Sequence, residues 1–291
     1  MLIQRQETFD SAEFQLYQFL IMSGSALIYD DLSLWAAPFG LKLLDTVRLR
    51  RGITIVDIGT GGGFPLIELA QRLDPSSTLY GIDPDNDVLA LARAKAAALQ
   101  LGNIRFLASP AEHTALADSS VDLIVSNNGM NNVADAERVL RECFRITRPG
   151  AQVVLTVNLP ETMKEFYSVF EAVLRDLSLT DEIKAMHEHI YAKRKPLATT
   201  EAWIRAAGFT IVSSRQDSFT LNYLDGTAFF RHHEISLYFL PPWRDVVRPE
   251  RVERVFAEIE DRLNEQAKRG ELRMTIPFVC IDSRKQKLCE P

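Results

Sequence analysis

The stretch VDIGTGGGFPLIELA, residues 56–70, decides the fold class. It opens with the end of ITIVDI (53–58), an apolar, β-branched run that predicts a buried strand. Four glycines follow the run: Gly59, Gly61, Gly62 and Gly63. An apolar segment with helical periodicity comes next, and Pro65 stands near its first turn, as is common at helix starts. Because glycine has no Cβ, the loop between strand and helix lets a ligand approach the backbone.

The same strand–helix rhythm continues on the C-terminal side. TLYGID (78–83) predicts a second strand, and NDVLALARAKAAALQ (86–100) predicts an Ala/Leu-rich helix. Three more strands are expected, at 104–107, 121–126 and 151–157. A helix over 134–147 is expected between the last two of them. Alternating strands and helices indicate a parallel sheet with helices on both faces, and ligands of such sheets bind beyond the carboxyl ends of the strands.

The rhythm changes after Asn158. Helices are expected over 161–177, 181–194, 199–209 and 249–268, and closing strands over FTIVSS (209–214) and RMTIPFVCID (273–282). The stretch between those strands is far too long for a hairpin connection, which indicates an insertion. We therefore divide the chain into an N-terminal helical cap (1–50), a cofactor-binding core (51–160) and a remainder (161–291). This last part would complete the sheet and carry substrate-lid insertions at about 161–198 and 215–270.

Composition excludes several classes of partner. A formal net charge of -6 offers no basic footprint for a nucleic-acid backbone. The sequence has no apolar run long enough to predict a membrane span, and its first residues do not resemble a secretory signal. The three cysteines (Cys143, Cys280 and Cys289) are odd in number and far apart, which suits a reducing cytoplasm. We expect a cytoplasmic protein.

Three kinds of ligand use a strand–glycine-loop–helix unit, and the loop discriminates among them. A nucleoside triphosphate needs a Lys after the glycines, and none is present. A dinucleotide favours GxGxxG, but Phe64 replaces the last glycine. What remains is DxGxGxG (57–63), with Asp83 at the end of the next strand. Asp57 suits an ammonium group and Asp83 suits ribose hydroxyls, so the pair favours a ligand with a sulfonium and an amino-acid end.

These motifs resemble the class I S-adenosylmethionine-dependent methyltransferases, specifically the group of quinone and small-molecule methyltransferases. The resemblance covers about residues 29–157 and rests on VDIGTGGG, GIDPDNDVLALA, SSVDLIVSN and RECFRITRPGAQVVLT. It implies S-adenosyl-L-methionine as the cofactor. It also implies a Rossmann-like, doubly wound α/β fold with a mostly parallel, seven-stranded sheet.

The resemblance further implies a set of cofactor contacts. The glycine loop would hold the methionine part, Asp83 the ribose and Pro84 one face of the adenine. Pro110 stands where the family has an acid, so the adenine edge would be bound by the Ala111 amide and Glu112. The complete set comprises Tyr29, Asp57, Gly59, Thr60, Gly61, Gly63, Asp83, Pro84, Ala111, Glu112 and Asn127.

Residues for the methyl acceptor are less well marked. Asn131 and Asn132 replace two histidines of the family pattern, so they either bind substrate or satisfy the loop backbone. Residues 222–243 are rich in aromatics, which indicates a lid over a flat or apolar acceptor, a local core or a dimer contact. The candidate substrate residues are Asn131, Asn132, Tyr223, Phe229 and Phe230. His232 and His233 are the candidate general bases. No histidine or cysteine spacing matches a metal-ligand pattern, so no metal is expected.

The sequence therefore predicts a methyltransferase acting on a small-molecule acceptor, with an aromatic or quinone-like acceptor favoured by the lid. The sequence does not distinguish O, N, S and C as the acceptor atom. The aromatic segment could also form the contact of a homodimer. A protein or peptide methyltransferase is one alternative function. A cofactor-binding module without turnover is the other.

Overall fold

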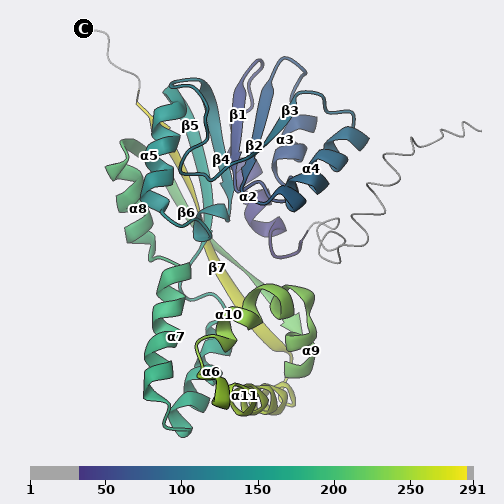
Figure 1. The fold of residues 1–291 in the computed structure, drawn as a ribbon, viewed down its shortest axis with the longest axis vertical. Coiled ribbons are helices and arrows are strands. Elements are labelled where there is room, and N and C mark those ends of the chain that lie inside the picture. Colours follow the sequence, from purple (N-terminus) through teal and green to yellow (C-terminus); the bar gives the residue numbers. More distant parts are fainter. Residues whose placement is uncertain (1–32, 287–291) are drawn as a thin grey trace, which may run out of the picture.

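The computed structural model describes residues 33–286, so the predicted contact Tyr29 and most of the predicted cap lie outside the described residues (Figure 1). The strands are β1 (Thr54–Ile58), β2 (Thr78–Asp83), β3 (Ile104–Ala108), β4 (Val121–Asn127), β5 (Thr147–Asn158), β6 (Phe209–Tyr223) and β7 (Leu272–Lys285). The α-helices are α2 (Ala37–Thr46), α3 (Leu66–Gln71), α4 (Asn86–Ala98), α5 (Ala136–Ile146), α6 (Lys164–Asp176), α7 (Thr180–Lys193), α8 (Leu197–Ala206), α9 (Gly226–Arg231), α10 (Leu240–Arg244) and α11 (Val252–Ala267). Shorter helical turns are η2 (Gly129–Asn131), η3 (Ile235–Phe239) and η4 (Pro249–Arg251).

The strands form one seven-stranded sheet in the order β3-β2-β1-β4-β5-β7-β6. Strands β1 to β5 pair in parallel, whereas β7 is antiparallel to both β5 and β6. The prediction of a doubly wound, mostly parallel sheet is confirmed. The strand order reverses between β1 and β4, and the carboxyl ends of these two strands are where ligands of such folds bind.

Each face of the sheet has its own hydrophobic core, because successive side chains of a strand point to opposite faces. In β1, Ile55 packs with residues of α2 and α3 on one face. Val56 and Ile58 pack on the other face, with residues of α5 and α8. The two cores fix β1, and so they also fix the loop that follows it.

A second lobe lies at one end of the sheet (Figure 1). It consists of α6, α7, α9, α10, α11 and the far halves of β6 and β7, which run from the sheet into this lobe. The predicted strand 209–214 was too short, since β6 continues to Tyr223 and pairs with β7 down to Leu272. Residues 215–218 of this edge strand are polar and exposed, so they interrupt the apolar signal that marks a strand.

Within residues 33–286, no helix is long and apolar enough to cross a membrane.

Candidate active site

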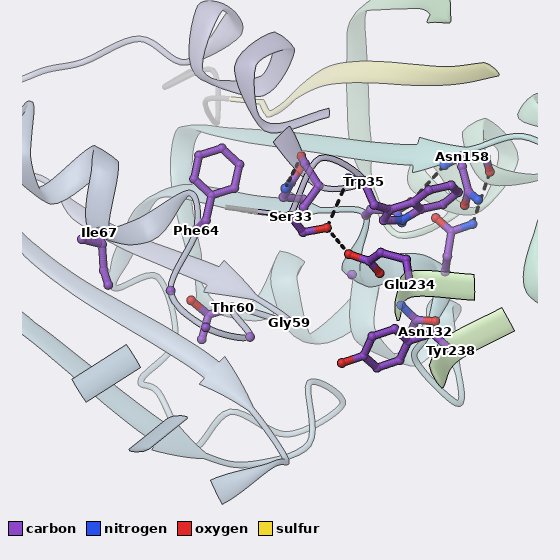
Figure 2. A pocket seen from close by; sticks show the side chains of 18 of the residues that line it. Ser33, Trp35, Gly59, Thr60, Phe64, Ile67, Asn132, Asn158, Glu234 and Tyr238 are labelled. Atoms are coloured by element: carbon purple, nitrogen blue, oxygen red, sulfur yellow. Dashed lines mark hydrogen bonds between the residues drawn. The ribbon is translucent and has the colours of Figure 1, made fainter. Parts of the chain in front are cut away.

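A cavity of about 870 Å³ lies where the carboxyl ends of the strands meet the second lobe. Its wall comes from residues 33–36, the loop 59–64 after β1, α3, the end of α4, residues 127–132 at the end of β4, Asn158, the end of α7 and residues 234–242. Figure 2 shows Gly59 and Thr60 on one side of this space, with Glu234 and Tyr238 on the other. The cavity thus joins the glycine loop, residues 59–63, to the second lobe.

The glycine loop follows β1 in a backbone conformation that favours glycine. Gly59, Gly61 and Gly63 have φ angles of +72°, +51° and +99°. Among the described residues, a Cβ on Gly61 would have one atom within 4 Å, the Val88 Cγ1 at 3.9 Å, so their packing does not explain why a side chain is missing there. Gly61 lines the cavity, and its bare backbone is therefore open to a ligand.

Asp83, at the end of β2, braces this loop. Its Oδ2 accepts a hydrogen bond from the Gly61 amide at 3.0 Å, and its Oδ1 accepts one from the Asp85 amide at 3.0 Å. Asp85, not Asp83, caps α4, because its side chain accepts from the amides of the first turn. A carboxylate offers about four lone-pair positions, so Asp83 keeps acceptor capacity for two ribose hydroxyls.

Asp57 is a buried carboxylate at the end of β1. It is 0% exposed, and neither oxygen has a hydrogen-bond partner among the described residues. Burial raises the pKa of Asp57 well above its ordinary value, and the nearby Thr60 hydroxyl opposes that shift only in part. An unpaired buried charge is costly, and a cationic ligand offsets the cost. The carboxylate and the open loop together fit a ligand with an ammonium group.

Asp57→Asn should therefore stabilise the ligand-free protein and weaken cofactor binding. A carboxyl whose pKa is raised on folding lowers stability as pH rises above its ordinary value of 3.8. The stability gained by the substitution should be absent near that pH and grow above it, to about 1–3 kcal/mol. Thermal melts across pH measure this gain, and calorimetry should show at least about tenfold weaker cofactor binding. The same change at exposed Asp261 is the control; a destabilised Asp57→Asn variant would contradict the account.

The structure separates the predicted cofactor residues into two groups. Gly59, Thr60, Gly61, Gly63 and Asn127 line the cavity. Among the described residues, the others lie outside its wall: Asp57, Asp83, Pro84, Ala111 and Glu112.

The second group is held by local contacts. Pro84 is exposed and Ala111 is buried, while Glu112 accepts a hydrogen bond from the Asp135 amide at 3.2 Å. The predicted contacts of all three residues with adenine stay predictions.

Asparagines at and beyond the ends of β4 and β5 line the acceptor side of the cavity. Asn127 joins α2 to the sheet, because its Nδ2 donates to the Ala36 carbonyl at 3.2 Å. Asn131 Nδ2 donates to the carbonyls of Asn158 at 3.3 Å and Lys193 at 3.0 Å, which favours the role of satisfying backbone groups. Its Oδ1 is buried and has no partner among the described residues. Asn131 and Asn132 both line the cavity, so a role in substrate binding stays open.

The predicted lid aromatics pack inside the second lobe. Phe229 is 0% exposed and belongs with Tyr223 to the core of that lobe, and Phe230 packs against the same core. The Phe166 and Trp243 rings, with centroids 4.0 Å apart, stack at its centre. Among the described residues these three predicted contacts are not in the cavity wall, because their rings fill the space between α6, α9 and α11.

The two candidate bases also lie behind the wall. The rings of His232 and His233 stack with centroids 4.7 Å apart, and His232 packs edge-on against Tyr223. Burial is the main cause that lowers the pKa of His232, and neighbouring His233 lowers it further. The next residue, Glu234, does line the cavity. Neither histidine is among the described residues of the wall, and the catalytic role of the pair stays a prediction.

Three residues of α7 and its C-terminal end line the cavity without having been predicted as site residues: His189, Lys193 and Arg194. His187, two positions earlier than His189, instead points away, and its Nε2 lies 3.3 Å from a Glu171 oxygen. Burial, followed by the charges of Arg194 and Lys193, lowers the pKa of His189 to about 4. His189 is thus neutral near pH 7. The helical period alone could not show which face of α7 meets the cavity.

Other residues outside the predicted contact set bring aromatic rings and a carboxylate to the wall, and some of them, such as Phe239, belong to the aromatic segment 222–243. Trp35 and Phe239 form an edge-on pair with centroids 4.9 Å apart, and both line the cavity. Ser33 donates a hydrogen bond to Glu234, as Figure 2 shows, and this contact joins the chain before α2 to the second lobe. These contacts link segments about 200 residues apart, and no local pattern indicates them.

Comparison with known proteins agrees with this geometry. A family model for a methyltransferase domain matches residues 49–200, more than half of the chain. Nocamycin O-methyltransferase from Saccharothrix syringae is 24% identical over 91% of this chain and 97% of its own length. Demethylmenaquinone methyltransferase from Lactococcus lactis is 27% identical over 62% of this chain and 73% of its own length.

Other matches are partial or concern the fold. Arsenite methyltransferase from Halobacterium salinarum is 28% identical over 46% of this chain, and the match spans only 36% of that relative's length. The solved structure of the YcgJ protein from Bacillus subtilis has a TM-score of 0.56 at 14% identity, and the match covers 86% of this chain and 98% of that one. The chain belongs to the methyltransferase-domain family, the S-adenosylmethionine-dependent methyltransferases.

Proposed function

We propose that this protein transfers a methyl group from S-adenosylmethionine to a small molecule bound in the cavity. The observation that carries the proposal is the shared wall: the glycine loop and the residues of the second lobe line one space of about 870 Å³. That volume lies within the usual range of small-molecule sites. A cavity roofed by a second lobe suits a small acceptor better than the open groove that a protein or peptide acceptor would require.

The residues of the chain have separable tasks in this reaction. The cofactor supplies an electrophilic methyl group on a sulfonium; the acceptor's lone pair forms the new bond to carbon while the sulfur keeps the electrons of the broken one. The charge of buried Asp57 would favour the ammonium group at the glycine loop, and Asp83 would bind the ribose. Trp35, Tyr238 and Phe239 would hold the acceptor against the loop and exclude water. Such alignment supplies much of the acceleration in a displacement of this kind.

The aromatic rings of the wall favour a flat acceptor. Trp35, Phe64, Tyr238 and Phe239 all line the cavity, and aromatic faces bury large areas of a planar ligand. The names of two relatives, demethylmenaquinone and nocamycin methyltransferase, support an organic acceptor of this kind. We therefore keep an aromatic or quinone-like molecule as the proposed acceptor class.

Arsenite fits the cavity poorly. The described cysteines, Cys143 and Cys280, are buried, free of disulfides and absent from the wall. Burial raises the pKa of Cys143 to about 12 and also raises the pKa of Cys280. Thiols held protonated are poor ligands for a metalloid. Free, buried thiols support the proposal of a reducing, cytoplasmic setting.

Asp83→Ala tests the cofactor part of the proposal. The change removes both an acceptor for the ribose and the brace on the Gly61 amide. Hydrogen bonds to a charged group are worth about 1.5–3 kcal/mol, so affinity for S-adenosylmethionine should fall at least about tenfold. Calorimetry measures the affinity, and Asp261→Ala is the matched control on the exposed side of α11. Equal affinity in the Asp83 variant would remove this residue from the site.

Turnover separates an enzyme from a binding module. The full chain should produce S-adenosylhomocysteine when given hydroxylated aromatic or quinol acceptors, and should not when given a peptide library. Product from peptides alone would support the protein methyltransferase instead. Cofactor binding without product from either set would support the module without turnover.

A further inference from the structure

Arg194 is a buried cation in the wall of the cavity. It directly follows α7, and its amide donates to the Ile190 carbonyl at 2.9 Å, which closes the helix. The residue is 4% exposed, and it lines the cavity together with Lys193. A guanidinium stays charged at any ordinary pH, so this charge is held away from bulk water.

Few of the N–H donors of this guanidinium have a hydrogen-bond acceptor among the described residues. Arg194 Nη1 donates to the Tyr167 hydroxyl at 3.2 Å, and that oxygen also accepts from Trp243 Nε1 at 2.8 Å. Its Nε is buried without a partner among the described residues. Across residues 33–286 the side chain forms no ion pair and no other hydrogen bond. The rings of Tyr167 and Phe239 lie 5.8 Å and 5.9 Å from its central carbon, which offsets only part of the charge.

The charges near Arg194 are mostly positive. Lys193 lines the same part of the cavity, and burial and the charges of both residues lower the pKa of His189, while Asp245 opposes that shift only in part. Glu234 is a carboxylate of the wall, but it accepts a hydrogen bond from Ser33, and it lies 3.8 Å from His233 Nε2. On the acceptor side of the cavity, the buried guanidinium of Arg194 thus has N–H donors available to a ligand. No carboxylate of residues 33–286 is bound to it.

We propose that the methyl acceptor carries a planar oxyanion, a carboxylate or a stabilised enolate, and that Arg194 binds this group. The planar guanidinium matches such an anion with parallel N–H donors, and buried charges in proteins are normally paired. The inference rests on the proposed function and adds the chemical class of the acceptor. It also agrees with the asparagines at 131 and 132, which stand where the family has histidines. An enolate oxygen has already lost its proton, so its methylation needs no general base.

The test uses the full chain saturated with S-adenosylhomocysteine and three small probes. Benzoate supplies a carboxylate, dimedone supplies a cyclic enolate at neutral pH, and benzamide is the neutral analogue of benzoate. Calorimetry should show that one or both anions bind at least tenfold more tightly than benzamide. The two anionic probes distinguish the carboxylate from the enolate. Equal binding of all three probes, or no binding of either anion, would overturn the proposal.

Arg194→Met keeps an apolar stem and removes the charge. We expect the variant to lose about 10–100-fold in affinity for the anionic probe and to bind S-adenosylhomocysteine as the parent does. Its ligand-free melting temperature should stay equal or rise, because an unpaired buried charge is gone. Lys184→Met, on the exposed side of α7, should change none of these values.

A purely structural arginine would give the opposite pattern. The melting temperature of Arg194→Met would fall while binding of the anionic probe persisted, and this result would overturn the proposal. Failure of the parent protein to bind S-adenosylhomocysteine would instead contradict the proposed function itself. The two failures are therefore distinguishable.

Discussion

Gly61→Val should remove most of the affinity for S-adenosylmethionine, about 100-fold or more, which corresponds to roughly 2.7 kcal/mol. Gly61 has a φ angle of +51° and lines the cavity, and the space that its Cβ would enter is almost empty of protein atoms. A branched side chain would therefore occupy the place of the cofactor. Calorimetric titration measures the loss.

A second substitution separates blocked binding from a misfolded loop. Asn tolerates a positive φ better than Val, so Gly61→Asn should fold with little strain and still obstruct the cofactor. Gly102→Val is the control, because no atom of residues 33–286 lies within 4 Å of its Cβ position and Gly102 is not among the described residues of the cavity wall. Full affinity in both Gly61 variants would mean that the loop is only a turn.

Phe229→Ala should strongly destabilise the second lobe. Phe229 is fully buried, with its ring 5.5 Å from Phe166 and 5.2 Å from Tyr223. Truncation of a core phenylalanine costs about 3–5 kcal/mol through lost burial and the cavity left behind. At about 2–4 °C per kcal/mol for a large domain, the melting temperature should fall by roughly 6–20 °C.

Leu224→Ala is the matched control for this substitution. Leu224 lies in the same segment but is 80% exposed, so its removal should change stability by less than about 0.5 kcal/mol. A Phe229→Ala protein that melts with the parent but turns over slowly would contradict the packing described above. That result would instead support the prediction from the sequence that Phe229 contacts the methyl acceptor.

The parts of the site that the sequence predicted are local in the chain. The glycine loop and Asp83 follow consecutive strands, and parallel pairing of β1 with β2 brings their ends together. The hydrogen bond from the Gly61 amide to Asp83 is the direct result. The parallel strands and this loop could thus be predicted from apolar runs and one glycine pattern, whereas the seven-stranded, doubly wound sheet was implied by the family resemblance.

The acceptor side could not be predicted in this way. An aromatic excess marks burial, but it does not say whether rings such as Phe229 face a ligand or each other. Arg194 reaches the cavity only because α7 packs against α6 and its C-terminal end meets the residues after β4. Contacts such as Ser33 with Glu234 depend on how the second lobe sits on the sheet, which no local period encodes.

The most direct test of the central claim is a calorimetric titration of the full chain with S-adenosylmethionine, with NAD titrated in parallel. The account predicts one cofactor per chain, a dissociation constant in the micromolar range and no heat of binding with NAD. Binding of NAD together with no binding of S-adenosylmethionine would contradict it.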